Sequence, residues 1–188
     1  MHFHLTYEGP LRASGNNSNR PKDKWDLRMA FHPQLEMLWQ LHPFLSSIGG
    51  EADGRGGRHE GKPIDVHGSK FRPLVRSSLK AICELQILFL RQGDPGALVS
   101  QSGDLDNRIK TLLDGLRMPL RDELPIPEPC PQPLYCLLES DALITGLAVN
   151  ADRLLSKPDA KPDHVHLVIR VRTSILEARL NNVGLLSS

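Results

Sequence analysis

Six prolines stand between Met118 and Leu134, at positions 119, 125, 127, 129, 131 and 133. Proline lacks a backbone N–H and has a fixed φ angle, so this density excludes a helix and an interior strand from the segment. A second break runs from Ser46 to Asp65, where six glycines and few apolar residues predict a flexible loop. Regular structure is therefore expected outside these two segments, and we interpret the proline-rich one as an insertion within a domain.

The length of 188 residues suits a single domain spanning 1–188, and a content of 39% hydrophobic and 24% charged residues is typical of a globular protein. The longest purely apolar run, residues 87–90, is far too short to span a membrane. The first nine residues lack the basic start and apolar stretch of a signal peptide, so we expect a cytoplasmic protein. The net charge of +1 means that any nucleic-acid binding must come from local clusters of basic residues.

Several segments have the alternating pattern of strands. Residues 2–8 and 81–90 each place apolar side chains on one face, although a helix starting near Ser77 is an alternative for the second segment. Residues 144–154 and 164–172 bracket the turn-rich sequence SKPDAKPD, which predicts a C-terminal hairpin.

Two helices are expected. Pro33 predicts the first turn of a short helix through QLEMLWQL. In residues 106–117 the apolar side chains recur at the i, i+3, i+4 and i+7 spacing of an amphipathic helix: Ile109, Leu112, Leu113 and Leu116. The expected fold is therefore mixed α/β (α+β), with a mixed β-sheet and the C-terminal hairpin packed against about two helices.

The sequence GDLDNRIKTLLDGL at the start of the second helix carries a notable group of charges. Asp104 and Asp106 are two positions apart, and Lys110 follows Asp106 by one helical turn. Paired carboxylates suit a hard cation such as Mg²⁺, and a third acid from elsewhere usually completes such a site. The same acids also suit a helix N-terminus, where they cap free N–H groups, and an ordinary i, i+4 ion pair. The spacing alone leaves both interpretations open.

The sequence DLDNRIKTLLDGL, followed by LLESDALITGLAV and HVHLVIRVR, resembles the RusA family of Holliday-junction resolvases. These are small homodimeric endodeoxyribonucleases that cut four-way DNA junctions with Mg²⁺. The resemblance covers roughly residues 85–172 and is most specific across D-x-D-N-x-x-K. It implies that Asp104, Asp106 and Asp141 bind the metal. It also implies that Lys110 is the catalytic lysine and that Asn107 supports the site.

Two features depart from the family pattern. Family members often have two adjacent acids at the third site, whereas Ser140 precedes Asp141 here and Glu139 is the alternative ligand. The proline-rich segment also lengthens the chain between the helix and the third acid. We expect an insertion beside the active site to influence which DNA shapes that site accepts.

Basic residues outside this motif are candidates for contacting DNA phosphates. Residues 69–80 contain no acid and four basic residues, Lys70, Arg72, Arg76 and Lys80. A fifth candidate, Arg108, lies in the motif itself. A solvated surface is the alternative interpretation of this run. His164 and His166 share one face of the last strand, where a zinc site is less expected than a surface pair because no further zinc ligands lie nearby.

We therefore expect a Mg²⁺-dependent endodeoxyribonuclease that resolves four-way junctions as a homodimer, in DNA recombination and repair, with no membrane partner. Metal-held carboxylates and a lysine supply what phosphodiester hydrolysis needs, namely an activated water and positive charge at the phosphate. Two alternatives stay open: a DNA-junction-binding protein on the same fold without cleavage, and a metal-dependent phosphohydrolase of small substrates.

Overall fold

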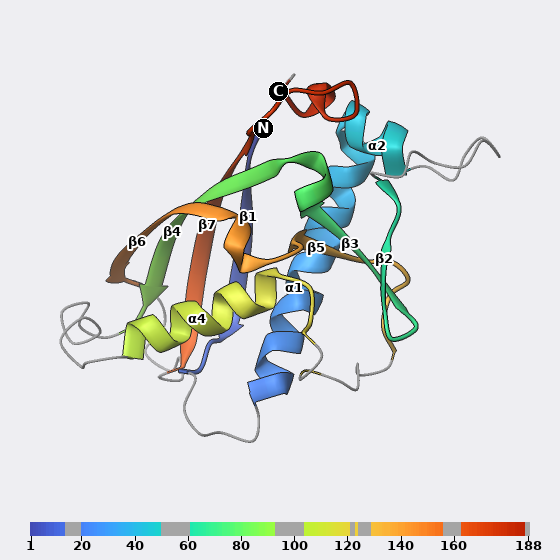
Figure 1. Cartoon of the computed structure of the whole chain (residues 1–188). Helices are drawn as coiled ribbons and strands as arrows, with labels where there is room; N and C mark the ends of the chain where they lie inside the picture. Colours follow the sequence, from blue (N-terminus) through green and yellow to red (C-terminus); the bar gives the residue numbers. More distant parts are fainter. Residues whose placement is uncertain are drawn as a thin grey trace.

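The computed structural model of the chain describes residues 1–13, 20–49, 61–92, 104–120, 123, 129–155 and 163–186. Within this part of the chain, two mixed β-sheets and three helices form an α+β domain (Figure 1). The predicted fold class, mixed α/β in one domain, is confirmed. None of the described helices combines the length and the apolar character that crossing a membrane requires.

The larger sheet has four strands in the order β1-β7-β4-β6. The bounds are His2–Pro10 for β1, His164–Ile175 for β7, Ala81–Arg91 for β4 and Ile144–Arg153 for β6. β7 runs antiparallel to both β1 and β4, whereas β6 runs parallel to β4. The alternating pattern of residues 81–90 therefore belongs to a strand, as predicted, and the helical alternative is wrong.

The smaller sheet contains β2 (Ile64–Val66), β3 (Ser69–Val75) and β5 (Leu134–Leu138), in that order. β3 is antiparallel to β2 and parallel to β5. The last five residues of β3 are all buried, so both faces of this strand are covered.

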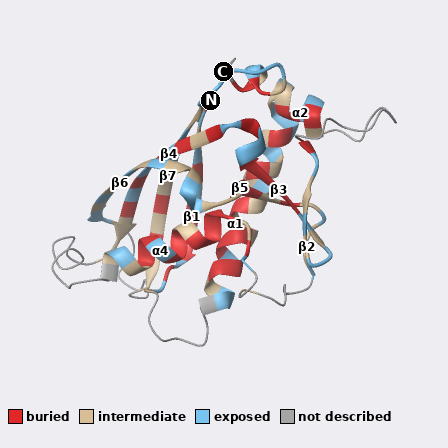
Figure 2. Ribbon diagram, viewed as in Figure 1, coloured by how far each residue is buried: buried red, intermediate tan, exposed pale blue. Residues whose placement is uncertain are grey.

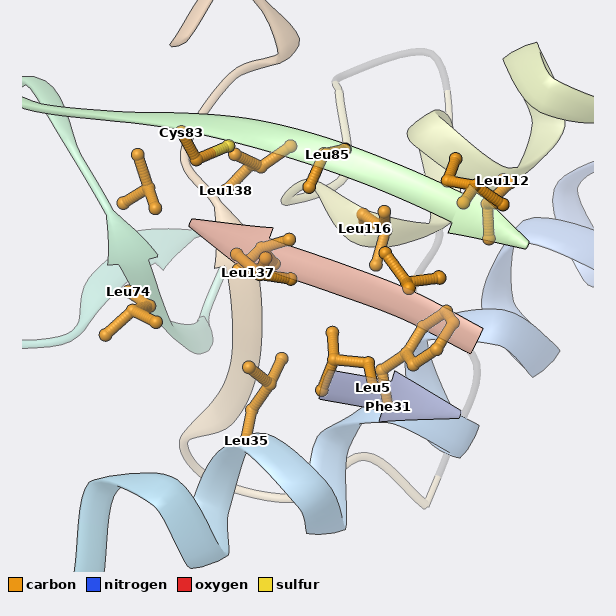
Figure 3. Packing of buried hydrophobic residues seen from close by; sticks show 14 of the residues in the cluster. Leu5, Phe31, Leu35, Leu74, Cys83, Leu85, Leu112, Leu116, Leu137 and Leu138 are labelled. Carbon is orange, nitrogen blue, oxygen red and sulfur yellow. The ribbon is translucent and has the colours of Figure 1, made fainter. Parts of the chain in front are cut away.

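The three helices are α1 (Arg20–Leu41), α2 (Pro43–Gly49) and α4 (Asp104–Leu116). Short 3₁₀ turns are η2 (Ser77–Leu79), η4 (Asp141–Leu143) and η5 (Val183–Leu186). Figure 2 shows buried residues along the sides of α1 and α4 and on alternate positions of the strands. Side chains from the larger sheet and the helices meet in the main core, shown in Figure 3 by Leu5, Phe31, Leu85 and Leu112 among others. A smaller cluster contains Trp25, Phe71, Leu134 and Cys136.

The predicted C-terminal hairpin is wrong, although both of its strands exist. β6 and β7 lie on opposite sides of β4 and do not pair with each other. β7 buries Val165, Leu167, Ile169 and Val171 fully, which suits a central strand with a neighbour on each side. β6 is mostly exposed or half-buried, which suits an edge. Alternation reports which face of a strand is buried, but it does not report the neighbouring strand.

The first helix begins much earlier than predicted. α1 starts at Arg20 and contains Pro33 in its interior, where proline removes one helical hydrogen bond. Four apolar side chains at i, i+4, i+8 and i+12 are all buried: Leu27, Phe31, Leu35 and Trp39. Packing of this face against the core offsets the cost of the proline, since helices in proteins depend mainly on tertiary packing.

The two segments predicted to lack regular structure are only partly described. Ser46–Gly49 belongs to α2 and residues 64–66 form β2, so the ends of the predicted 46–65 loop are ordered elements; residues 50–60 lie outside the described part. In the proline-rich segment, residues 118–120 and 129–133 have neither helix nor strand, as predicted. The Met118 N–H donates to the Leu138 carbonyl at 2.9 Å, which ties the end of α4 to β5.

Gly115 permits the close approach of α4 to α1. A Cβ atom at this position would lie 2.6 Å from Cβ of Leu27, an atom too near the backbone to move aside. We expect Gly115→Ala to destabilise the protein by about 1–3 kcal/mol, although alanine is the better helix former by ~1 kcal/mol. Urea unfolding measures this. Gly146→Ala is the matched control, because its Cβ would meet only the flexible side chain of Glu84 at 3.1 Å. An equal or higher stability of Gly115→Ala would contradict the close packing.

Candidate functional site

α4 presents one face to the core and the other to the predicted site. Ile109, Leu112 and Leu116 are buried, as the amphipathic spacing predicted. Asp106 and Lys110 are exposed on the outer side of the helix. Asp104 begins α4, but its side chain lies outside the described set. Asn107 is half-buried, and its carbonyl accepts a hydrogen bond from Thr111 Oγ1 at 3.0 Å, a contact within the helix.

Asp141 lies at the start of η4, directly before β6. Ser140 caps this turn, because its Oγ accepts from the Ala142 N–H at 3.3 Å, and Asp141 itself is exposed. Glu139, the alternative third acid, accepts the Ser77 N–H at 2.7 Å and so binds the start of η2. Asp141 is the more exposed of the two carboxylates, and its Oδ1 accepts from Ser140 Oγ at 3.4 Å.

Lys110 and Asp141, from distant parts of the sequence, line the same pocket of about 370 Å³. The pocket lies between α1, α4 and η4, and its described lining residues are Pro21, Lys24, Lys110, Asp114, Arg117, Leu120, Glu123 and Asp141. Asp106 is one helical turn before Lys110 on the same side of α4. Two of the predicted site residues are thus brought together, and a third is on the adjacent turn.

A buried ion network forms the inner wall of this pocket. Lys24 Nζ lies 2.9 Å from both Asp114 Oδ2 and Glu123 Oε1. Arg117 Nη2 contacts the same two acids, at 2.7 Å and 2.9 Å. Arg28 Nη2 donates to Glu123 Oε2 at 2.5 Å. Three cations therefore surround one glutamate, and two of them also hold Asp114.

Two members of the network, Asp114 and Arg117, have pKa values shifted toward their charged forms. Burial acts to raise the pKa of Asp114, but hydrogen bonds from Lys24 and Arg117 outweigh it and hold that pKa below its usual value. Burial acts to lower the pKa of Arg117, but the neighbouring Glu123 and Asp114 carboxylates raise it above its usual value.

Sequence reasoning missed most of this network. The i, i+4 spacing of Lys24 and Arg28 within an apolar helix face was a signal for it, but α1 was not predicted that far toward the N-terminus. Glu123 is in the proline-rich segment, where no periodic pattern indicates its position. The partners lie far apart in sequence; Lys24 and Glu123 are separated by 99 positions.

The arginines expected to contact DNA do not lie on an open surface. Arg72, Arg76 and Arg108 are each at most 7% exposed. Arg76 Nη1 donates to the Lys62 carbonyl at 3.0 Å, and the Arg108 guanidinium donates to the carbonyl of Leu11. This burial disagrees with the prediction that these side chains bind phosphates.

Arg72 has a partner set of its own. Its guanidinium lies 5.4 Å from the centre of the Trp39 ring and 5.5 Å from that of Tyr135, and Nη1 donates to the Gly49 carbonyl at 3.0 Å. These contacts give Arg72 a structural role between α1, α2 and β5. Of the five predicted DNA-binding cations, Lys70 and Lys80 are the two that are exposed.

The two described acids of the predicted metal site, Asp106 and Asp141, are both exposed. Asp106 and Asp141 are carboxylates of the kind that Mg²⁺ prefers, so the donor set fits this ion in type. Among the described side chains, no group of three His, Cys, Asp or Glu residues is arranged to hold a metal ion, and Asp104 is not in that set. His164 and His166 both lie near the Glu8 carboxylate, with N–O distances of 3.5 Å and 3.8 Å.

Comparison with protein-family models, with curated proteins and with solved structures finds no match to this chain. The likeness to junction resolvases therefore stays an inference from the D-x-D-N-x-x-K motif and the acid that precedes β6.

Proposed function

We propose that the protein is a Mg²⁺-dependent endodeoxyribonuclease that cuts four-way DNA junctions in recombination and repair. The observation that carries the proposal is the pocket shared by Lys110 of α4 and Asp141 of η4. The resemblance to the RusA family assigns roles to both residues, and their common pocket is a geometry in which both can act on one substrate group.

In this proposal Asp104, Asp106 and Asp141 hold the Mg²⁺ ion. Bound there, the ion supplies an activated water and screens the charge of the phosphate. Lys110 has an exposed ammonium group on the pocket wall, where it donates hydrogen bonds to the phosphate oxygens as negative charge builds up on them.

A second candidate is a phosphohydrolase of small substrates. The volume of about 370 Å³ falls within the usual range of small-molecule sites, ~300–1,000 Å³, which favours this candidate.

Labelled four-way junction, linear duplex and flap DNA, each incubated with and without Mg²⁺, separate the possible functions. Cleavage of the junction alone supports resolution; cleavage of all three indicates a nuclease with broad shape tolerance; binding without cleavage leaves a junction-binding protein.

Lys110→Gln is expected to slow junction cleavage by more than about a hundredfold, because it removes charge that stabilises the transition state. The Kd for the junction is expected to change by no more than about tenfold, since one cation among many adds little to DNA affinity. Single-turnover cleavage and gel-shift binding measure the two effects. Arg170→Gln, at an exposed position on β7 outside the predicted site, is the control and should leave both quantities nearly unchanged. Equal losses of cleavage and binding in Lys110→Gln would make Lys110 a phosphate anchor only.

We propose a homodimer as the active species. A four-way junction has two-fold symmetry, and its resolution needs two matched nicks on opposing strands, which a C₂ dimer supplies with two identical sites. Light scattering is expected to give a mass of about twice the 20.9 kDa of one chain. A species of single-chain mass, unchanged by added junction, would exclude the dimer.

A further inference from the structure

The buried network beside the pocket has more positive than negative charge. Lys24, Arg28 and Arg117 contribute three cations, and Asp114 and Glu123 contribute two anions, so the described network sums to +1. All five side chains are at most 10% exposed. Unbalanced charge that is withdrawn from water is costly unless a counter-ion lies close to it.

The pocket is where such a counter-ion has access. Lys24 and Arg117 line it from the network, and Lys110 lines it from the exposed side of α4. The Asp141 carboxylate also lines it and offsets the charge of Lys110, so the described charges of the network and the pocket together still sum to +1. Its volume of about 370 Å³ accommodates a phosphate group with several waters, since one water takes about 30 Å³ of liquid volume. The described lining includes no aromatic side chain on which a base could stack. The pocket is therefore suited to recognise charge.

Unused hydrogen-bond donors point to the same ligand. The ammonium group of Lys24 has three N–H donors, and its contacts with Asp114 and Glu123 take two of them. Arg117 has five donors, of which its contacts with Asp114, Glu123 and the Met118 carbonyl take three. Lys110 is exposed and makes no ion pair or hydrogen bond with the described residues. Lys24, Arg117 and Lys110 therefore each have at least one N–H donor left to bind an anion with several oxygens.

We propose that this pocket binds a phosphate group through Lys24, Arg117 and Lys110. Glu123 sets the affinity, because its carboxylate shares the Lys24 and Arg117 cations and reduces the positive charge that the phosphate meets. The further assignment, that this group is a backbone phosphate of DNA next to the cleaved bond, rests on the proposed nuclease function. Phosphate binding itself does not depend on it.

Titration of the full-length protein with inorganic phosphate, and separately with the dinucleotide dTpdT, tests the proposal. Both titrations are made without Mg²⁺ and at low ionic strength, and are followed by NMR chemical shifts. We expect saturable binding of one phosphate per chain. Lys24→Gln should weaken it about tenfold and Glu123→Gln should tighten it about tenfold, the effect expected of one charged hydrogen-bonding group. Arg170→Gln, which changes net charge by the same amount on an exposed residue of β7 that does not line the pocket, should leave it unchanged.

The opposite signs separate a binding role from a structural one, because loss of structure would weaken binding in both variants. Circular dichroism melting checks the fold of each; if Lys24→Gln does not fold, Lys110→Gln at an exposed position takes its place with the same expected tenfold loss. Failure of both ligands to saturate the protein, or equal affinity in Lys24→Gln, Arg170→Gln and the parent chain, overturns the proposal. If inorganic phosphate binds but dTpdT does not, only the assignment to the DNA backbone is overturned. Since no cleavage is measured, the result is independent of nuclease activity.

Discussion

Asp141→Asn is expected to lower Mg²⁺-dependent junction cleavage by more than about a hundredfold. Loss of a residue that only supports a metal ligand costs ~10–100-fold, and loss of a ligand itself should cost at least as much. Junction binding should be retained or become tighter, because one negative charge that repels phosphate is removed. Single-turnover cleavage of a labelled junction and gel-shift binding without Mg²⁺ measure the two quantities.

Glu139→Gln is the matched control for Asp141→Asn. Glu139 is two residues earlier, and its carboxylate accepts the Ser77 N–H at 2.7 Å instead of facing the pocket. The amide oxygen of glutamine can accept the same hydrogen bond, so this variant should fold and cut normally. Full activity in Asp141→Asn together with loss of activity in Glu139→Gln would move the third ligand to Glu139.

Arg28→Met is expected to lower the free energy of unfolding by about 3–5 kcal/mol, the usual cost of removing one partner from a buried ion pair. Arg28 is 3% exposed. Its Nη2 donates to the Asp114 carbonyl at 2.8 Å and its Nε donates to the Arg117 carbonyl at 2.9 Å, so it caps the C-terminal end of α4. The same Nη2 binds Glu123. Methionine leaves both carbonyls and part of the Glu123 charge without their donor.

Urea unfolding at neutral pH measures this loss, which is a large part of the ~5–15 kcal/mol stability of an ordinary domain. Arg170→Met is the matched control, because Arg170 is exposed on β7 and surface substitutions usually change stability by less than about 0.5 kcal/mol. A loss below about 1 kcal/mol in Arg28→Met would mean that the network contributes little to holding α1 against α4.

Local periodicity was sufficient to predict the elements that have one buried face. β1, β4 and α4 follow from their alternation or their 3.6-residue period, which depends only on neighbouring residues. The pairing of β6 with β4 was not predictable in this way, because strand partners are chosen by contacts over long sequence separations. The start of α1 was missed because its first turns are rich in charged residues, and burial of those charges depends on α4 and Glu123.

The candidate site was partly predictable for the same reasons. The D-x-D-N-x-x-K spacing and the acid before β6 indicated Lys110 and Asp141, which share a pocket in the structure. The burial of the three arginines was not predicted, because a basic run in the sequence indicates charge but not exposure. Arg72 and Arg76 lie in or next to β3, a strand covered on both faces, so their guanidinium groups bind backbone carbonyls inside the protein.

The position of nicks in a four-way junction tests the proposed function most directly. The protein is incubated with junctions labelled on one strand at a time, first with EDTA and then with Mg²⁺. The proposal predicts no cleavage in EDTA, and with Mg²⁺ two nicks placed symmetrically on opposing strands, which Asp141→Asn does not produce. A junction that stays intact with Mg²⁺ while the protein is bound to it would contradict the proposal that this protein is a nuclease.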